Sequence, residues 1–97
     1  SGGGLTENLP RSMPDNLCAE IDTNSWEMPS IFKWLKENGN ISEDAMHRIF
    51  NCGIGMVLFV NEDEELNISS RIKELKMNSF VIGKVKNKKE ESSVIFV

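Results

Sequence analysis

Residues 1–11 read Ser-Gly-Gly-Gly-Leu-Thr-Glu-Asn-Leu-Pro-Arg, so three successive glycines stand directly before a predicted short helix. Glycine has no Cβ, which lets its backbone N–H groups approach a ligand closely and lets it adopt positive φ. A helix that begins there directs its free N–H groups and the positive end of its dipole outward, a geometry that suits a phosphate. A frayed chain end is the alternative, because no lysine follows as it would in a P-loop.

A second glycine stretch, Arg-Ile-Phe-Asn-Cys-Gly-Ile-Gly-Met, occupies residues 48–56 between a predicted helix and a predicted strand. Two glycines beside a strand indicate a bulge or a close approach of backbone to another group. Asn51 offers hydrogen-bond donors and acceptors at this junction, and Arg48 can hold an oxyanion in its guanidinium fork. A tight turn beside a solvent-exposed arginine is the simpler alternative.

Length and composition favour one ordinary globular domain, residues 1–97. The chain is 39% hydrophobic and 27% charged, and its net charge of -4 argues against nucleic acid as a partner. No apolar run approaches the roughly 20 residues of a membrane-spanning helix. Two distant cysteines, Cys18 and Cys52, predict free thiols of a reducing compartment, and a single histidine predicts no metal site.

The order of predicted elements mixes helices and strands without regular alternation. Helices are expected over Leu5–Met13, Met28–Asn38, Ser42–Phe50 and Asn61–Leu75, and strands over Leu17–Asp22, Met56–Val60, Phe80–Val85 and Ser93–Val97. Met56–Val60 is apolar on both alternating faces, which predicts a central strand covered on both sides. We therefore expect an α+β fold of two layers, in which a mixed sheet of about four strands packs against helices.

The predicted helices are each expected to bury an apolar face. These faces include Ile31 with Trp34, Met46 with Ile49, and Leu66 with Leu75. Ser42 is expected to cap the helix that it begins, and Asn61 with Glu64 is expected to form a capping box. Cys52 is expected to be a small packed residue.

Several other side chains are assigned structural roles at this stage. The short loop between Met28–Asn38 and Ser42–Phe50 predicts a helical hairpin. The polar stretch Lys86–Glu91 is expected as a solvated hairpin loop between the last two strands, and Glu20 as a solvated residue on the outer face of its strand. His47 falls beside the apolar face of its helix, which favours a structural role.

Taken together, the two glycine stretches resemble one family. Gly2–Arg11 looks like the glycine-rich segment of aminoimidazole ribonucleotide synthetase, also called phosphoribosylformylglycinamidine cyclo-ligase, and residues 48–56 are similar to its second signature. Trp26–Leu35 and the Phe-Val-Ile-Gly of residues 80–83 fit the same family. The resemblance covers nearly the whole chain in order, and it implies the fold of that enzyme's C-terminal domain.

The resemblance also implies a reaction and its partners. The family closes the imidazole ring of formylglycinamidine ribonucleotide in purine biosynthesis, with ATP activating the formyl oxygen. ATP and Mg²⁺ are bound mainly by an N-terminal domain that also builds a homodimer, and this domain is absent from the 97 residues. The expected partners are therefore that domain and a phosphorylated ribonucleotide, in the cytoplasm, with no nucleic acid and no membrane. The chain alone is expected to be inactive.

The resemblance assigns a set of binding residues and no catalytic base. The expected phosphate- and substrate-binding residues are Gly2, Gly3, Gly4, Asn8, Arg11, Arg48, Asn51, Gly53 and Gly55. Simpler roles are open for two of them, a surface ion pair of Arg11 with Glu7 or Asp15 and a helix hydrogen bond of Asn8. Two other functions are also open: a non-catalytic ligand-binding or interaction module, and a domain of a related two-domain ATP-dependent enzyme that makes selenophosphate or acts on thiamine monophosphate.

Overall fold

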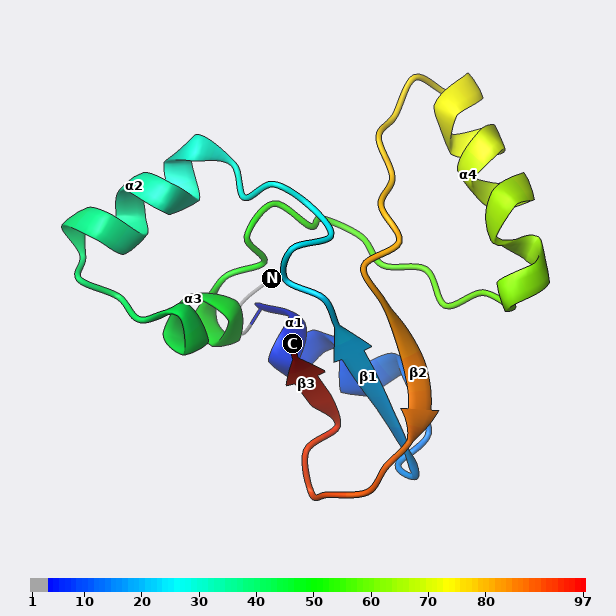
Figure 1. Cartoon of the computed structure of the whole chain (residues 1–97), viewed down its shortest axis with the longest axis horizontal. Helices are drawn as coiled ribbons and strands as arrows, with labels where there is room; N and C mark the ends of the chain where they lie inside the picture. The colour runs from blue at the N-terminus through cyan, green and yellow to red at the C-terminus, as the bar shows by residue number, and fades with distance from the viewer. Residues whose placement is uncertain (1–3) are drawn as a thin grey trace.

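The computed structural model describes residues 4–97 and contains a three-stranded sheet with helices around it (Figure 1). The strands are β1 (Leu17–Ile21), β2 (Gly83–Asn87) and β3 (Val94–Phe96). β1 lies in the middle, antiparallel to β2 and parallel to β3. The α+β class and the mixed sheet are confirmed, whereas the sheet has three strands and not four.

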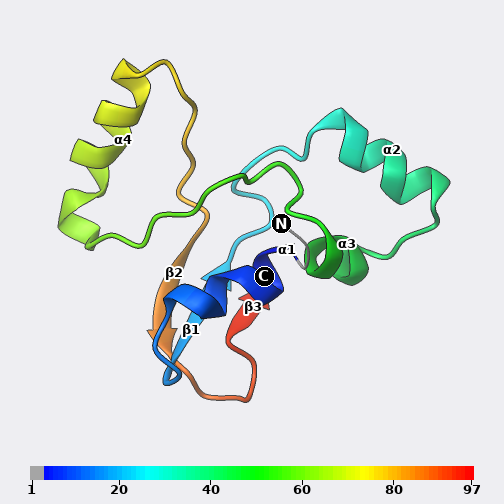
Figure 2. The ribbon, with the colours of Figure 1, turned by 180° about the vertical axis from the view of Figure 1, so that it is seen from behind.

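The core lies where the N-terminal segment covers one face of this sheet. The helix α1 (Gly4–Asn8) continues into the 3-10 turn η1 (Leu9–Ser12), and together they lie across the sheet in Figure 2. Pro10 falls in the first turn of η1, where its missing N–H costs no hydrogen bond. Most of the buried apolar side chains form one cluster: Leu5, Leu9, Ala19, Ile21, Trp26, Met46, Cys52 and Val94. The expected short helix, interrupted by a proline, is confirmed.

The helix α3 (Glu43–Ile49) begins as its sequence predicts. The Ser42 side chain accepts a hydrogen bond from the backbone N–H of Ala45 at 3.2 Å, which satisfies one free donor of the first turn. Met46 is fully buried. The expected inward position of Ile49 is wrong, since that side chain is 49% exposed, and His47 is buried in its place. α3 thus turns a different face toward α1 and the end of β3.

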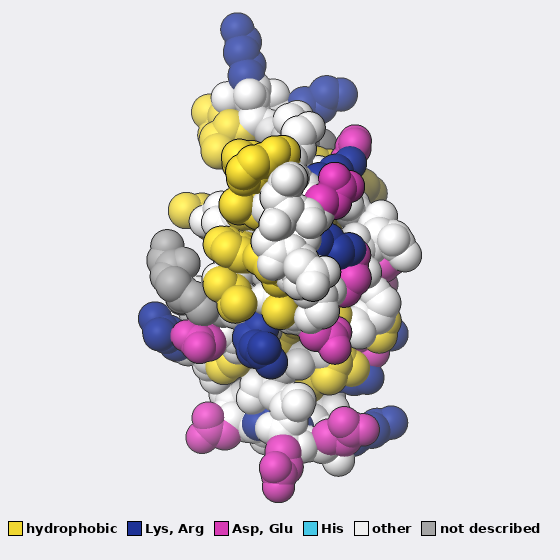
Figure 3. Space-filling view, turned by 90° about the vertical axis from the view of Figure 1, so that its left-hand side faces the viewer, with side chains coloured by type: hydrophobic (Ala, Val, Ile, Leu, Met, Phe, Trp, Pro, Cys, Tyr) yellow, Lys and Arg dark blue, Asp and Glu magenta, His cyan; other side chains and the backbone are white. Residues whose placement is uncertain are grey.

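The helix α2 (Ser30–Asn38) is present, but its expected apolar stripe is not buried. Ile31 and Trp34 are 59% and 58% exposed. Figure 3 faces this side of the molecule and shows hydrophobic side chains exposed to solvent among charged ones. α2 meets α3 through a contact between the Phe32 and Phe50 rings, 6.0 Å apart, and through an ion pair of Lys36 with Glu43. The two helices of the predicted hairpin therefore touch through these two contacts, and the apolar face of α2 that includes Ile31 and Trp34 does not pack against α3.

The expected central strand Met56–Val60 is not formed. Met56 is 81% exposed and Leu58 55% exposed, so this stretch is not covered on both sides. In the order β2-β1-β3 the outer edges of β2 and β3 are open to a further strand, and Met56–Val60 pairs with neither of them. The tendency of an apolar sequence to form a strand depends on packing against neighbouring strands, which the exposed Met56 and Leu58 side chains lack.

The helix α4 (Glu65–Glu74) follows a 3-10 turn, η2 (Glu62–Glu64), and projects away from the sheet in both ribbon views. The expected capping box at Asn61 is wrong, because no side-chain cap is made there. Leu66 and Leu75, expected to face inward, are 77% and 72% exposed. None of the helices within residues 4–97 is long and apolar enough to cross a membrane.

β2 and β3 do not form the expected hairpin, since β1 lies between them. The strand β2 continues to Asn87, so Lys86, expected in the solvated loop, lies on the same strand as Lys84. Lys86 Nζ lies 2.7 Å from Glu20 Oε2, and Lys84 Nζ lies 3.8 Å from Glu20 Oε1. The hydrogen bond from Lys86 lowers the pKa of Glu20 and raises that of Lys86. Glu20 is thus a cross-strand partner and not a plainly solvated side chain.

Candidate functional site

The first glycine stretch packs against the end of α3 and the start of the second glycine stretch. At Gly4, a Cβ would lie 2.5 Å from the carbonyl oxygen of Phe50 and 3.0 Å from that of His47. The residue also has a φ of 56°, in the left-handed region that favours glycine. Thr6 Oγ1 donates to the same His47 carbonyl at 3.5 Å. α1 is therefore fixed against the end of α3, whereas Gly2 and Gly3 lie outside the described residues.

The second glycine stretch is a tight turn held by Asn51. Its Oδ1 accepts a hydrogen bond from the N–H of Gly53 at 3.0 Å, and its carbonyl accepts one from Ile54 at 3.0 Å. Gly53 has a φ of 102°, and a Cβ there would lie 2.5 Å from Cδ of Pro29. A Cβ on Gly55 would meet no heavy atom within 4 Å. Gly53 is therefore required by the packing, while Gly55 presents an open backbone.

The remaining predicted binding residues have separate surroundings. Asn8 Nδ2 donates to the carbonyl oxygen of Gly4 at 2.7 Å, the helix hydrogen bond that was the simpler expectation for this side chain. Arg11 and Arg48 are exposed, and neither forms an ion pair within residues 4–97. The ion pair with Glu7 or Asp15, the simpler alternative for Arg11, is thus not made, and both arginine side chains are exposed.

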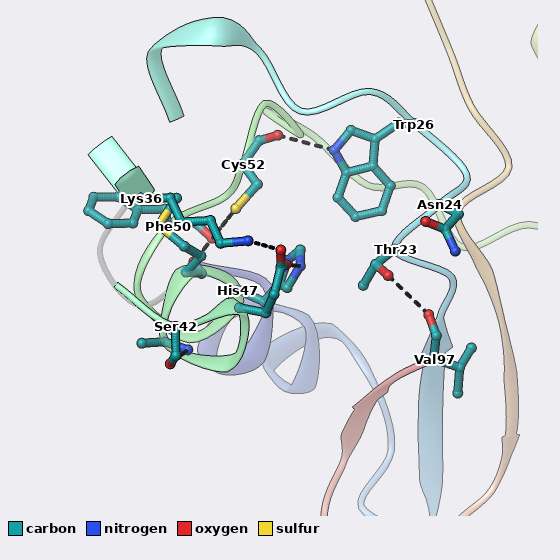
Figure 4. Close-up of polar contacts among 12 residues, drawn as sticks. Thr23, Asn24, Trp26, Lys36, Ser42, His47, Phe50, Cys52 and Val97 are labelled. Atoms are coloured by element: carbon teal, nitrogen blue, oxygen red, sulfur yellow. Dashed lines mark hydrogen bonds and ion pairs between the residues drawn. The ribbon is translucent and has the colours of Figure 1, made fainter. Parts of the chain in front are cut away.

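A groove of about 550 Å³ lies on the other side of α3, between α2, the loop after β1 and the end of β3. We call it the His47 groove. Its walls include Trp26, Lys36, Glu43, His47 and Phe96. Figure 4 shows the ion pair of Lys36 beside the His47 ring, with Trp26 on the facing loop. No motif in the sequence pointed to this groove, because its walls come from four separate segments.

His47 is the most buried polar residue of the groove, with 5% of its surface exposed. Its ring stacks on Phe96 with centroids 4.9 Å apart and meets the edge of Trp26 at 6.2 Å. Nε2 lies 3.5 Å from Glu43 Oε2, and Nδ1 is buried without a hydrogen-bond partner within residues 4–97. The ion pair with Lys36, followed by the contact with His47, lowers the pKa of Glu43. The Glu43–His47 spacing on one helix face was the available sequence signal for this pair.

Cys52 is a packed residue, as the sequence suggested. It is fully buried, and its Sγ donates to the Met46 carbonyl at 3.6 Å. Burial, with a smaller contribution from the negative charge of Glu43, raises the pKa of the Cys52 thiol. The thiol therefore stays protonated at neutral pH and is a poor nucleophile. Within residues 4–97 no three His, Cys, Asp or Glu side chains come together as a metal site would require.

The fold and the site define a small α+β domain in which two glycine-bearing segments are joined through α1 and α3. Residues 1–96 match the family model described as AIR synthase related protein, C-terminal domain. The chain belongs to this family, which confirms the resemblance of the two glycine stretches. This match shows membership of the family and does not identify which reaction the chain takes part in.

Proposed function

We propose that this chain is the C-terminal domain of an ATP-dependent cyclo-ligase of de novo purine biosynthesis, which converts formylglycinamidine ribonucleotide to aminoimidazole ribonucleotide. Membership of the family over residues 1–96 supports this assignment. The observation that carries it is the close packing of Gly4 against the carbonyls of His47 and Phe50, which sets the first glycine stretch beside the second. The first glycine stretch is thereby set next to the second, and phosphate binding uses the backbone N–H groups of such segments.

On this proposal the predicted residues divide into two roles. Gly2, Gly3, Gly4 and Gly55 supply backbone donors to the phosphate of the ribonucleotide, with the exposed guanidinium groups of Arg11 and Arg48 nearby in sequence. Asn8, Asn51 and Gly53 hold the backbone of the two stretches, through the hydrogen bonds and packing described above. ATP and Mg²⁺ are bound mainly by an N-terminal domain, which also supplies the homodimer contacts in the cytoplasm. The isolated chain therefore has no activity.

Reconstitution tests this proposal. The purified chain is mixed with an N-terminal ATP-binding domain of the family, and ADP and aminoimidazole ribonucleotide are measured with formylglycinamidine ribonucleotide as substrate. Turnover is expected only when both halves are present. Gly55→Val, which projects into open space, is expected to fold normally and to lose most of the turnover, whereas Ser92→Val in the exposed loop before β3 retains it.

Failure would be informative in two ways. A folded and associated pair that binds the ribonucleotide without turning it over would contradict the cyclo-ligase assignment and favour a non-catalytic ligand-binding module. Turnover of ATP with selenide or with thiamine monophosphate in place of the purine precursor would assign the chain to one of the related two-domain enzymes.

A further inference from the structure

The segment from residue 56 to residue 81 leaves an unusual number of apolar side chains in water. Of the fourteen large hydrophobic side chains that are exposed within residues 4–97, nine lie in this segment. They are Met56, Leu58, Phe59, Val60, Leu66, Leu75, Met77, Phe80 and Val81. Such a concentration of exposed apolar side chains indicates a surface that another molecule covers, because monomeric proteins rarely expose large apolar patches.

The helix α4 occupies the middle of this segment and stands apart from the core. It projects away from the sheet in Figures 1 and 2, and within residues 4–97 none of its apolar side chains belongs to the buried cluster or packs against it. Ile68, Ile72 and Leu75 follow at intervals of four and three residues, so they share one face of the helix. Ile68 and Ile72 are half-buried and Leu75 is 72% exposed, so this face is not covered by the core.

The charges around α4 are divided between its two ends. Residues 62–65 at its start are all acidic, whereas Arg71, Lys73 and Lys76 lie at its end. Within residues 4–97 the only ion pair among these groups joins Arg71 to the neighbouring Glu74. Ten residues of α-helix span about 15 Å, which exceeds the Debye length of about 8 Å at physiological salt. The two ends of one helix therefore attract each other little.

A second α4 laid in the opposite direction accounts for both the charges and the apolar face. A two-fold axis perpendicular to the helices sets the acidic end of each copy beside the basic end of the other, and it sets the two apolar faces against each other. A parallel pair would instead bring the two acidic ends together. The helix dipole also favours acidic residues at the start and basic ones at the end, but it leaves the apolar face in water.

We propose that α4 is a self-association surface, through which two copies of this chain form an antiparallel dimer. A helix face about 15 Å long and about 10 Å wide is far smaller than the roughly 800 Å² that each partner buries in a stable complex, so the dimer is a weak and reversible one. The proposal does not depend on the cyclo-ligase assignment, because neither glycine stretch takes part. It is also separate from the homodimer contacts assigned to the N-terminal domain.

A concentration series in the analytical ultracentrifuge tests whether the full chain associates. The mass is expected to rise from that of one chain toward that of two between micromolar and millimolar concentration. The association is expected to weaken as salt is added, because dissolved ions screen the attraction between the oppositely charged helix ends.

An exchange of charges between the two ends tests the antiparallel arrangement. One variant carries Glu64→Lys with Glu65→Lys, and the other carries Lys73→Glu with Lys76→Glu. Each variant alone sets like charges opposite one another at these positions, so it is expected to associate about tenfold more weakly. An equimolar mixture sets opposite charges together at both ends and is expected to regain the original affinity. If the charges serve only the helix dipole, the mixture stays as weak as the separate variants.

A polar substitution tests the apolar face. Ile72→Ser is expected to weaken the association at least about tenfold, since it removes apolar surface from the centre of the contact. Ile31→Ser makes the same change on α2, where Ile31 is 59% exposed, and is expected to leave the association unchanged. Isoleucine and serine have similar helix propensities, and circular dichroism checks that the helix content is retained. If Ile72→Ser does not fold, the exchange of charges still decides the question.

Four results would overturn the proposal. The first is a chain that stays monomeric at millimolar concentration, and the second is a mixture of the charge variants that associates no better than each alone. The third is an equal loss from Ile31→Ser and Ile72→Ser, which would place the contact elsewhere. The fourth is a monomeric chain whose α4 amide signals shift in NMR only when an N-terminal ATP-binding domain is added, which would assign the apolar face to that domain.

Discussion

The indole Nε1 of Trp26 donates a hydrogen bond to the carbonyl oxygen of Cys52 at 3.1 Å, and both residues are buried. Trp26 lies in the loop after β1, and Cys52 lies in the second glycine stretch. This one bond therefore ties the end of the sheet to the segment proposed to bind phosphate. Trp26 also lines the His47 groove.

Removal of this donor is expected to destabilise the domain. Trp26→Phe leaves the Cys52 carbonyl buried without its partner, which costs about 1–3 kcal/mol of unfolding free energy. Urea denaturation followed by circular dichroism measures the change. Trp34→Phe is the matched control, because Trp34 is 58% exposed and its replacement should change stability by less than about 0.5 kcal/mol. Equal effects of the two substitutions would contradict the role of the Trp26 bond.

The two glycines of the second stretch should respond differently to a methyl group. Gly53→Ala places a Cβ against the Pro29 ring at a φ of 102°, so a loss of about 1–3 kcal/mol is expected. Gly55→Ala meets open space and should be neutral within about 0.5 kcal/mol. Thermal unfolding of the two variants checks this order, and a larger loss for Gly55→Ala would show that the turn is packed differently.

The Cys52 thiol should be slow to react in the folded chain. Its pKa is raised by burial, so little thiolate is present at neutral pH, and the side chain is fully buried. Labelling with iodoacetamide, localised by mass spectrometry, should modify Cys52 far more slowly in buffer than in urea. Rapid labelling of Cys52 in the folded chain would contradict both its burial and its raised pKa.

The carboxyl group of Glu20 should titrate at an unusually low pH because of Lys86. Its pKa is lowered in the folded chain, so the interaction stabilises the fold above the unfolded pKa of Glu20 and is lost as the pH falls through the folded value. Lys86→Met is expected to raise the pKa measured by NMR, whereas Lys89→Met should leave it in place. A Glu20 titration that does not move in Lys86→Met would rule out this cross-strand pair.

The features that were predicted correctly from the sequence are local ones. The alternation of Leu17–Ile21 defines β1, and Ser42 with the acidic residues after it defines the start of α3, because each signal depends on neighbours within a few residues. Met56–Val60 shows the limit of such signals. Its composition is that of a buried strand, but strand formation depends on packing against neighbouring strands, and this stretch pairs with neither outer edge of the sheet.

Some features of the candidate site could likewise be predicted from the sequence, and others could not. The glycine requirement at Gly4 and Gly53 could be anticipated, although the groups that impose it, the Phe50 carbonyl and the Pro29 ring, depend on tertiary packing. The His47 groove could not be anticipated, because its walls come from segments far apart in the chain. A lone histidine on an apolar helix face carries no sign of which nitrogen will be left without a partner.

The position of β1 also has a consequence for the chain as it is synthesised. β1 is synthesised before both of its partners, which lie within residues 83–96, so both of its edges are unpaired until those residues have been made. Pairing across such a separation is slow compared with helix formation. Until the sheet closes, the backbone groups of residues 17–21 are open to pairing with another molecule.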